Sequence, residues 1–190
     1  MLRSIIDNPP QLKHRKPTPR YAHVSLNLCA VCVSGDQKWS VDQMPAEFQT
    51  TIMNTLATSQ LVVRINNTVL YTGNIPQHSM AINGKVDDAH TMTHQLEFII
   101  DGLDQQHGGW NVDGFGRVNI MLNCASFELE GLDMCRTLAD KGTYTVDHVV
   151  HIPGGLYGQN GVVAFDFCTP IYPWLLANDP ESYNNRYTSW

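Results

Sequence analysis

The 190-residue chain lacks the features of a membrane or secretory sequence. It has no stretch of the roughly 20 apolar residues that a membrane span needs, and no apolar run follows its charged amino terminus. Hydrophobic residues make up 43% of the chain, which is enough apolar content for one core. We therefore expect a single soluble domain that makes no contact with a membrane.

The chain also lacks the even number of cysteines that a complete set of disulfides requires. Its five cysteines are scattered through apolar contexts, which favours reduced thiols packed as small hydrophobic side chains after cytoplasmic synthesis. Cys29 and Cys32 form a C-x-x-C, but it falls inside an apolar strand pattern and has no second pair to complete a zinc site. No disulfide framework is expected.

Catalytic motifs are missing as well. The chain contains no G-x-S-x-G, H-E-x-x-H or G-x-x-x-x-G-K-[ST] sequence. His107 is close in sequence to Asp104 and Asp113, but no nucleophile stands beside it. These absences favour a protein that is not an enzyme and needs no cofactor.

Basic residues are scarce after the first twenty positions. Those twenty residues carry five basic side chains and one acid, a net charge of +4; because the whole chain carries −6, the remainder carries −10. Four prolines prevent a helix in this arm and interrupt sheet pairing, so alone in solution it is expected to be disordered. We expect it to dock on an acidic neighbouring subunit. The predicted partner-binding residues are Arg3, Lys13, Arg15, Lys16 and Arg20.

This charge pattern also bears on other partners and on domain boundaries. The acidic remainder of the chain repels nucleic acid, and the arm is too sparse in charge and aromatic rings to form a stacking groove, which makes nucleic acid an unlikely partner. The predicted division is an extended arm over 1–22, a β-sandwich domain over 23–176 and a tail over 177–190.

Alternating apolar and polar residues predict an all-β fold from Tyr21 onward, an antiparallel β-sandwich or jelly roll of about eight strands. The segment 61–72 predicts a hairpin that turns at 66–67, with Thr68, Leu70 and Thr72 on its core side. The strands are expected at 23–31, 61–65, 68–72, 94–101, 117–122, 127–129, 144–150 and 163–167.

One helix is expected over 45–57, because Pro45 suits a first helical turn and Phe48, Ile52 and Leu56 recur at four-residue spacing. It would cap an open end of the sandwich, and a second helical turn is expected after Pro173. Three loops rich in glycine and polar residues are expected at the surface, where binding residues tend to lie. They span 73–93, 102–116 and 151–161.

Acidic residues in these loops suggest two interpretations. Asp101, Asp104 and Asp113, with Asp87 and Asp88, supply the oxygen ligands that calcium prefers. Asp-Gly is also an ordinary turn dipeptide, and the spacing does not match an EF-hand, so plain turn chemistry is favoured over a calcium site.

Loop aromatics suggest a second site. Trp110, Phe115 and Tyr157 are candidates for an aromatic platform that stacks against the C–H face of a sugar ring. The alternative is a lid over the edge of the core, since large aromatic side chains are often only partly buried.

Four segments carry a resemblance to known proteins: 61–73, 94–107, 116–134 and 160–176. They resemble small β-sandwich structural proteins of tailed bacteriophages, particularly those that infect cyanobacteria. The ending is the most specific part, an Asn-Gly before an alternating strand and then a Pro-x-Tyr-x-Trp-Leu-Leu turn. Its residues are Asn160, Gly161, Pro170, Tyr172, Trp174, Leu175 and Leu176.

The resemblance implies a non-enzymatic virion protein, a capsid decoration or a tail or neck component that is made in the host cytoplasm. It would dock on other virion proteins through its arm and form a homo-oligomer. The chain is also similar to calcium-dependent carbohydrate-binding modules with a jelly-roll fold. That similarity implies the alternative function, in which the loops around Trp110 bind a host-surface glycan, with or without the help of calcium.

Overall fold

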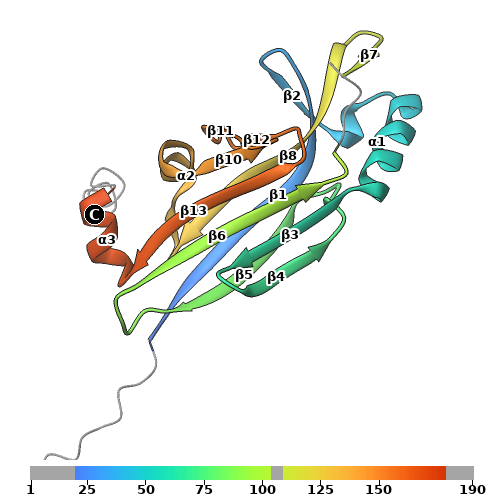
Figure 1. Cartoon of the computed structure of the whole chain (residues 1–190). Coiled ribbons are helices and arrows are strands. Elements are labelled where there is room, and N and C mark those ends of the chain that lie inside the picture. Colours follow the sequence, from blue (N-terminus) through green and yellow to red (C-terminus); the bar gives the residue numbers. More distant parts are fainter. Residues whose placement is uncertain (1–19, 104–108, 179–190) are drawn as a thin grey trace, which may run out of the picture.

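The computed structural model describes residues 20–103 and 109–178, which form two antiparallel sheets packed face to face (Figure 1). The predicted antiparallel β-sandwich is therefore confirmed. In the first sheet, β8 and β1 lie side by side at the centre and the other strands pair with one of them. Its strands are β1 (Tyr21–Ser34), β2 (Gln37–Ser40), β5 (Met80–Asp87), β7 (Trp110–Val112), β8 (Gly116–Leu129), β9 (Leu132–Asp133) and β12 (Leu156–Tyr157).

The second sheet has the strand order β11-β10-β13-β6-β3-β4. Its long central strands β13 and β6 pair along the whole of β13, from Gly161 opposite Ile100 to Thr169 opposite Met92. The strands are β3 (Gln60–Ile65), β4 (Thr68–Gly73), β6 (Met92–Asp101), β10 (Thr143–Val146), β11 (Val149–His151) and β13 (Gly161–Thr169).

Strand β1 runs the length of the first sheet. One edge pairs with β8, while the other edge pairs with β5 along Tyr21–Leu28 and with β2 along Val31–Ser34. Val24, Leu26 and Leu28 are buried and the intervening residues are partly exposed, as their alternation predicts. A single strand thus connects the two ends of the sandwich.

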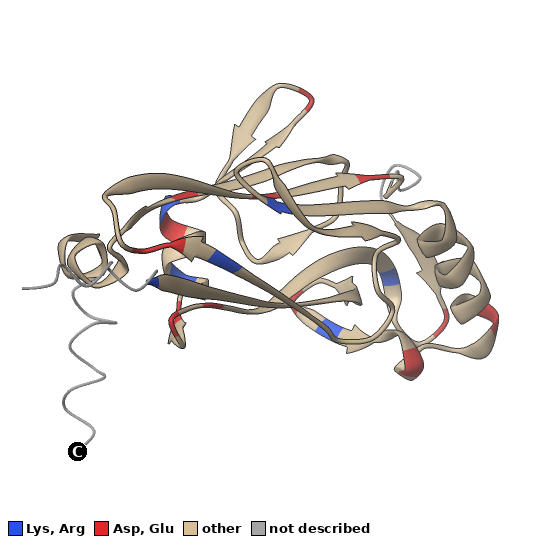
Figure 2. Ribbon diagram, turned by 90° about the horizontal axis from the view of Figure 1, so that it is seen from below, with Lys and Arg blue, Asp and Glu red and all other residues tan. Residues whose placement is uncertain are grey.

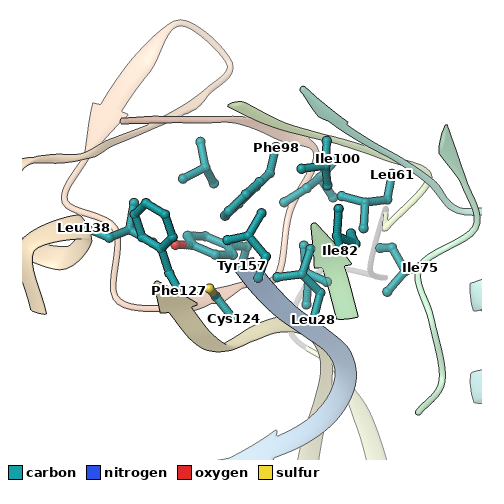
Figure 3. Packing of buried hydrophobic residues seen from close by; sticks show 14 of the residues in the cluster. Leu28, Leu61, Ile75, Ile82, Phe98, Ile100, Cys124, Phe127, Leu138 and Tyr157 are labelled. Atoms are coloured by element: carbon teal, nitrogen blue, oxygen red, sulfur yellow. The ribbon is translucent and has the colours of Figure 1, made fainter. Parts of the chain in front are cut away.

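The core lies between the sheets and is closed by aromatic contacts across them (Figure 3). Phe127 of β8 packs edge-on against Phe165 of β13, with ring centroids 5.4 Å apart. Phe98 of β6 meets Tyr157 of β12 at 6.3 Å. Burial of such large rings dominates the stability of a core of this kind.

The predicted hairpin forms between β3 and β4, with Asn66 in the left-handed region at φ 53°. The predicted core side of β4 is wrong, because Thr68 and Thr72 are exposed and Leu70 is only partly buried. The register shifts at a bulge between Val63 and Arg64, which moves the residues of this edge strand relative to their partners.

Several elements differ from the expected ones. The segment 144–150 is not one strand but the hairpin β10–β11, which turns at Asp147 and His148 with positive φ angles of 46° and 66°. Each of the three expected loops contains a strand: β5, β7 and β12, respectively. The two segments expected at 117–122 and 127–129 form the single strand β8.

The described residues include four short helical segments (Figure 1). The expected helix over 45–57 is confirmed as α1, whose buried residues are the expected Phe48, Ile52 and Leu56. The helix after strand β9 was not expected. The bounds are η1 (Val41–Gln43), α1 (Ala46–Thr58), α2 (Cys135–Lys141) and α3 (Ile171–Asn178).

Helices α1 and α3 lie at opposite ends of the sandwich (Figure 1). Acidic positions occur at both ends, including the one that α1 covers (Figure 2). Strand β1 begins at Tyr21, and α3 extends to Asn178.

Two further facts concern the described residues only. None of their helices is long and apolar enough to cross a membrane. All five cysteines are free thiols, of which Cys32 and Cys124 are buried.

Candidate functional site

The strand β7 and the start of β8 form a hairpin that projects at the α1 end of the sandwich (Figure 1). Gly109, with φ +78°, brings the chain so close to β8 that an added Cβ would lie 2.5 Å from the carbonyl oxygen of Val118. The turn is closed by a hydrogen bond from the Phe115 N–H to the Val112 carbonyl oxygen, 3.0 Å long. The left-handed conformation of Gly114 completes this turn and explains the Asp113-Gly114 dipeptide.

Two aromatic contacts fix the hairpin to the body of the protein. Trp110 packs against Phe48 of α1 with ring centroids 5.9 Å apart. Phe115 packs edge-on against Trp39 of β2 at 5.2 Å. Both Trp110 and Phe115 remain partly exposed despite these contacts.

A groove of about 350 Å³ lies between the first half of α1 and this hairpin. The α1 wall follows from the helix pattern: Phe48 is buried against the core, while Glu47 and Thr51 are turned toward the groove. The opposite wall is β7 and the residue after it. The lining residues are Pro45, Glu47, Phe48, Thr51, Trp110, Asn111, Val112 and Asp113.

The polar side chains of the groove make no hydrogen bond or ion pair within the described part of the chain. Glu47, Asn111 and Asp113 are exposed, and no hydrogen bond or ion pair joins their side chains to another described residue. The lining residues include two carboxylates but no lysine or arginine. The groove therefore presents an indole ring surrounded by free hydrogen-bonding groups and negative charge.

Only part of the predicted aromatic platform is found here. Trp110 lines the groove and Phe115 supports its hairpin from the side of β2. Tyr157 is fully buried, where it packs between Phe98 and Tyr144, so its place in an exposed platform is wrong. The reason is that β12 pairs with β8 and turns this side chain into the core.

The predicted calcium ligands are dispersed. Asp113 lines the groove, Asp101 accepts a hydrogen bond from the N–H of Gly102 in a tight turn, and Asp104 lies outside the described residues. Among residues 20–103 and 109–178, no group of three or more His, Cys, Asp or Glu side chains is arranged to hold a metal ion.

Asp87 and Asp88 do not join these acids. Asp87 pairs with Tyr21 at the start of β1, whereas the β7 hairpin lies beyond the other end of that strand. The intervening length of β1 is about 40 Å at the usual rise of a strand. Asp113 and the Asp87–Asp88 pair are therefore at opposite ends of the sandwich.

At that second end, Asp88 is buried and fully engaged. One carboxylate oxygen accepts the N–H of Ile171 at the start of α3, 2.9 Å away, and the other lies 3.1 Å from Nε of Arg20. The N–H of Asp88 in turn donates to the carbonyl oxygen of Arg20. Arg20 thus pairs within its own chain, while the other predicted partner-binding residues, Arg3, Lys13, Arg15 and Lys16, lie outside the described residues.

His94 belongs to a buried network at the same end. The hydroxyl of Thr169 donates to the His90 carbonyl oxygen, so it accepts a hydrogen bond from Nε2 of His94. The side-chain oxygen of Asn66 accepts the N–H of Gln95, which leaves the Asn66 amide N–H to donate to Nδ1 of His94. This arrangement requires a neutral imidazole. Burial lowers the pKa of His94 and prevails over the opposing effect of Asp87 and Asp88.

Comparisons with known proteins add only distant likenesses. No family model matches the chain, and no curated protein matches its sequence. A solved structure of the module vCBM60 in complex with galactobiose is similar over 75% of this chain and 96% of that one, with 7% identity and a TM-score of 0.35. A selenomethionine form of vCBM60, described among calcium-dependent carbohydrate-binding modules, gives 76% and 89% coverage, 8% identity and a TM-score of 0.35.

Proposed function

We propose that the groove between α1 and β7 binds a carbohydrate. The observation that supports this proposal is the partly exposed side chain of Trp110, surrounded by hydrogen-bonding side chains that have no partner in the described part of the chain. An indole face stacks on the C–H face of a sugar, and carboxylates and amides take its hydroxyl groups. The groove has the size of a small-ligand site.

The charge of the groove restricts the class of sugar. Glu47 and Asp113 are both lining residues, and no lining residue carries a positive charge. Uronic acid and sulfated sugars would bring a like charge beside these carboxylates, which weakens binding. The proposed ligands are therefore neutral or amino sugars.

The environment of Glu47 and Asp113 favours ligand binding over catalysis. A glycosidase requires one carboxyl group held in an apolar environment to act as an acid. Glu47 and Asp113 are both exposed, and neither has a hydrogen-bonded neighbour among the described residues that would orient it. They are suited to accept hydrogen bonds from hydroxyl groups.

The test is retention of the full-length protein on neutral, amino-sugar and uronate polysaccharides. Trp110→Ala is expected to reduce retention on the ligand polysaccharide about 5- to 150-fold, because stacking on a ring is worth about 1 to 3 kcal/mol. Trp110→Phe should keep a large part of it, and Asp140→Asn, at an exposed position on α2 away from the groove, should keep all of it. Equal retention of Trp110→Ala and the wild type would refute the proposal.

Calcium is tested separately from sugar binding. If Asp113 acts through a calcium ion with Asp104 and Asp101, chelation should weaken retention as much as Asp113→Asn does. If Asp113 bonds the sugar directly, chelation should have no effect while Asp113→Asn still weakens retention. Either result leaves the role of Trp110 intact.

A second function is supported by the division of charge along the chain. The first twenty residues carry +4 and the remainder −10, which suits an arm that reaches an acidic neighbour. We propose that the protein is a virion structural component that docks on neighbouring subunits through this arm and presents the groove to the host. The two functions are compatible.

Deletion of residues 2–19 tests the second function, since it removes most of the basic charge but keeps Arg20 and its contact with Asp88. The truncated protein should remain folded and retain its sugar binding, yet fail to enter particles. Replacement of only Lys13, Arg15 and Lys16 by glutamine should give a smaller loss. Normal incorporation of both variants would exclude docking through the arm.

A further inference from the structure

Strand β11 forms one edge of the second sheet and is exposed along its whole length (Figure 1). The side chains of Val149 and Val150 are 56% and 63% exposed, and Ile152, which follows the strand, is 82% exposed. Three of the eight exposed large hydrophobic side chains of the described residues thus lie within four consecutive positions. Apolar side chains that gather on a surface in this way mark an interaction site.

The chain is held in place on both sides of this segment. Before it, Asp147 and His148 form the turn of the β10–β11 hairpin with positive φ angles. After it, Pro153 is buried beside Gly142, where an added Cβ would lie 3.0 Å from Cγ of Pro153. The hairpin and the buried proline therefore keep Ile152 in its exposed position.

The same turn determines which backbone groups of β11 face outward. Val146 and Val149 flank a two-residue turn, and residues in these positions exchange both of their hydrogen bonds. The next pair, Thr145 and Val150, is therefore a non-hydrogen-bonded pair. The N–H and C=O of Val150 point away from β10, toward a side on which no strand of the described residues lies.

Other edge strands carry features that discourage pairing with another chain. Strand β4, at the opposite edge of the same sheet, pairs with β3 through a bulge between Val63 and Arg64, and β2 and β5 contain Lys38 and Lys85. Bulges and lysines are common protection for an unpaired edge. Strand β11 pairs with β10 without a bulge, and Val149–Ile152 contains no acid, lysine or arginine. This edge is thus open to an added strand.

We propose that β11 pairs with β11 of a second copy of this chain, in antiparallel direction about a two-fold axis at Val150. The proposal depends neither on the carbohydrate groove nor on the arm. Under this symmetry Val150 lies opposite its own copy and exchanges both outward backbone hydrogen bonds with it. Val149 then lies opposite His151 of the second copy. The edge is complementary to itself, because its outward-facing residue is at the centre of the exposed segment.

The charge around β11 is compatible with a second copy. Residues 21–190 carry −10, and the acid nearest to Val150 in sequence is Asp147. In the proposed pairing the two Asp147 residues lie on opposite sides of the axis, about 20 Å apart at the usual rise of a strand. This separation exceeds the Debye length of about 8 Å at physiological ionic strength, so their repulsion is largely screened.

The interface is small and closes at two copies. Four residues a side pair along the edge, compared with the roughly 20 to 30 residues a side of a stable complex, so we expect a dissociation constant on the order of 0.1 mM. Each copy uses its β11 edge once, which leaves no edge of this kind for a third copy.

Sedimentation equilibrium of the full-length protein between about 10 µM and 1 mM tests the proposal. The wild type should pass from monomer to dimer over this range and form nothing larger. Val150→Lys and Val150→Glu should each remain monomeric, because like charges face each other across the axis. Their equimolar mixture should recover the dimer, since each lysine then faces a glutamate. Val150→Pro, which removes only the outward N–H, should also remain monomeric.

Matched variants at the opposite edge are the controls. Val69→Lys and Val69→Glu alter an exposed valine of β4 and should dimerise as the wild type does. Circular dichroism verifies that all variants fold, and the wild-type result stands without them. Deletion of residues 2–19 should leave the dimer intact, which separates this contact from docking through the arm.

Four outcomes would each overturn the proposal. The first is a wild type that stays monomeric at about 1 mM, as it would if only a different polypeptide paired with β11. The second is a dimer that survives Val150→Lys, and the third is an equimolar mixture of the two charged variants that remains monomeric. The fourth is loss of the dimer when residues 2–19 are deleted.

Discussion

The polar side chains at the two ends of the sandwich differ in whether they are hydrogen-bonded within the chain. At the α3 end, Asp88, His94 and Asn66 are hydrogen-bonded to other parts of the same chain. At the α1 end, Glu47 and Asp113 face a groove and have no partner among the described residues. Polar groups of the first kind stabilise a fold, because breaking their bonds leaves a buried group unsatisfied. Groups of the second kind are available to a ligand.

This difference makes the ends separable by mutation. Changes to the hydrogen-bonded polar side chains at the α3 end should lower stability without altering the groove, and changes to the unpartnered polar side chains of the groove should weaken ligand binding without lowering stability. The largest effect on stability is expected from Asp88→Ala, which should lower the free energy of unfolding by about 2 to 4 kcal/mol because the Ile171 N–H loses a buried charged acceptor. Urea denaturation measures it. Asp140→Ala, an exposed acid, is the control and should change stability by less than about 0.5 kcal/mol.

The second effect concerns the groove. Gly109→Ala should displace β7 and reduce sugar retention severely, because the new Cβ meets the backbone of Val118, and should cost about 1 to 3 kcal/mol of stability. Gly114→Ala has nearly the same φ but open space around its Cβ, so it isolates the cost of the backbone angle. Retention equal in the two variants would show that the close approach of β7 to β8 does not shape the groove.

A third effect is confined to low pH. The pKa of His94 in the folded protein is lowered from its usual 6.5, so the unfolded chain binds a proton where the folded chain does not. The contribution of neutral His94 to stability is therefore complete above pH 6.5 and is lost as the pH falls below it. Urea midpoints of the wild type should decline over this range more steeply than those of His94→Phe. His90→Gln, at an exposed histidine, should follow the wild type. Identical slopes for all three proteins would contradict this role of His94.

The smallest effect is expected for Arg20→Ala. The Arg20 side chain is 64% exposed, so its ion pair with Asp88 should contribute no more than about 1 kcal/mol, and less in high salt. The backbone bond from Asp88 to the Arg20 carbonyl oxygen is retained in this variant. A loss as large as that of Asp88→Ala would mean that the charge pair, rather than the Ile171 N–H, is the main partner of Asp88.

The sequence predicts long strands better than short ones. Strands β1, β6 and β13 alternate over many residues, and α1 has a clear four-residue spacing, so their existence follows from local pattern. Strand β12 has two residues and β7 has three, too few for any period to be visible. Tyr157 was misplaced for this reason, since the glycine-rich segment around it has the composition of an exposed loop.

Only some of the residues that line the groove could be predicted from the sequence. Trp110 and Asp113 are conspicuous in a polar loop and were candidates, although for two separate sites. Glu47, Thr51 and Asn111 were missed, because polar residues on a helix or beside a turn are typical of any solvated surface. About sixty residues separate the two walls, and no local pattern shows that α1 and β7 meet.

If the protein is attached through its arm and binds through its groove, as proposed, strand β1 has a mechanical consequence. It begins next to the arm at Tyr21 and ends at the turn beside the groove, where Ser34 lies near Gly116. A pull between these ends acts along the strand axis, while the bonds to β8 run across it. Such a load is shared by all these bonds simultaneously and does not open them one by one. In such an attachment, the first sheet would transmit tension along β1 to the groove.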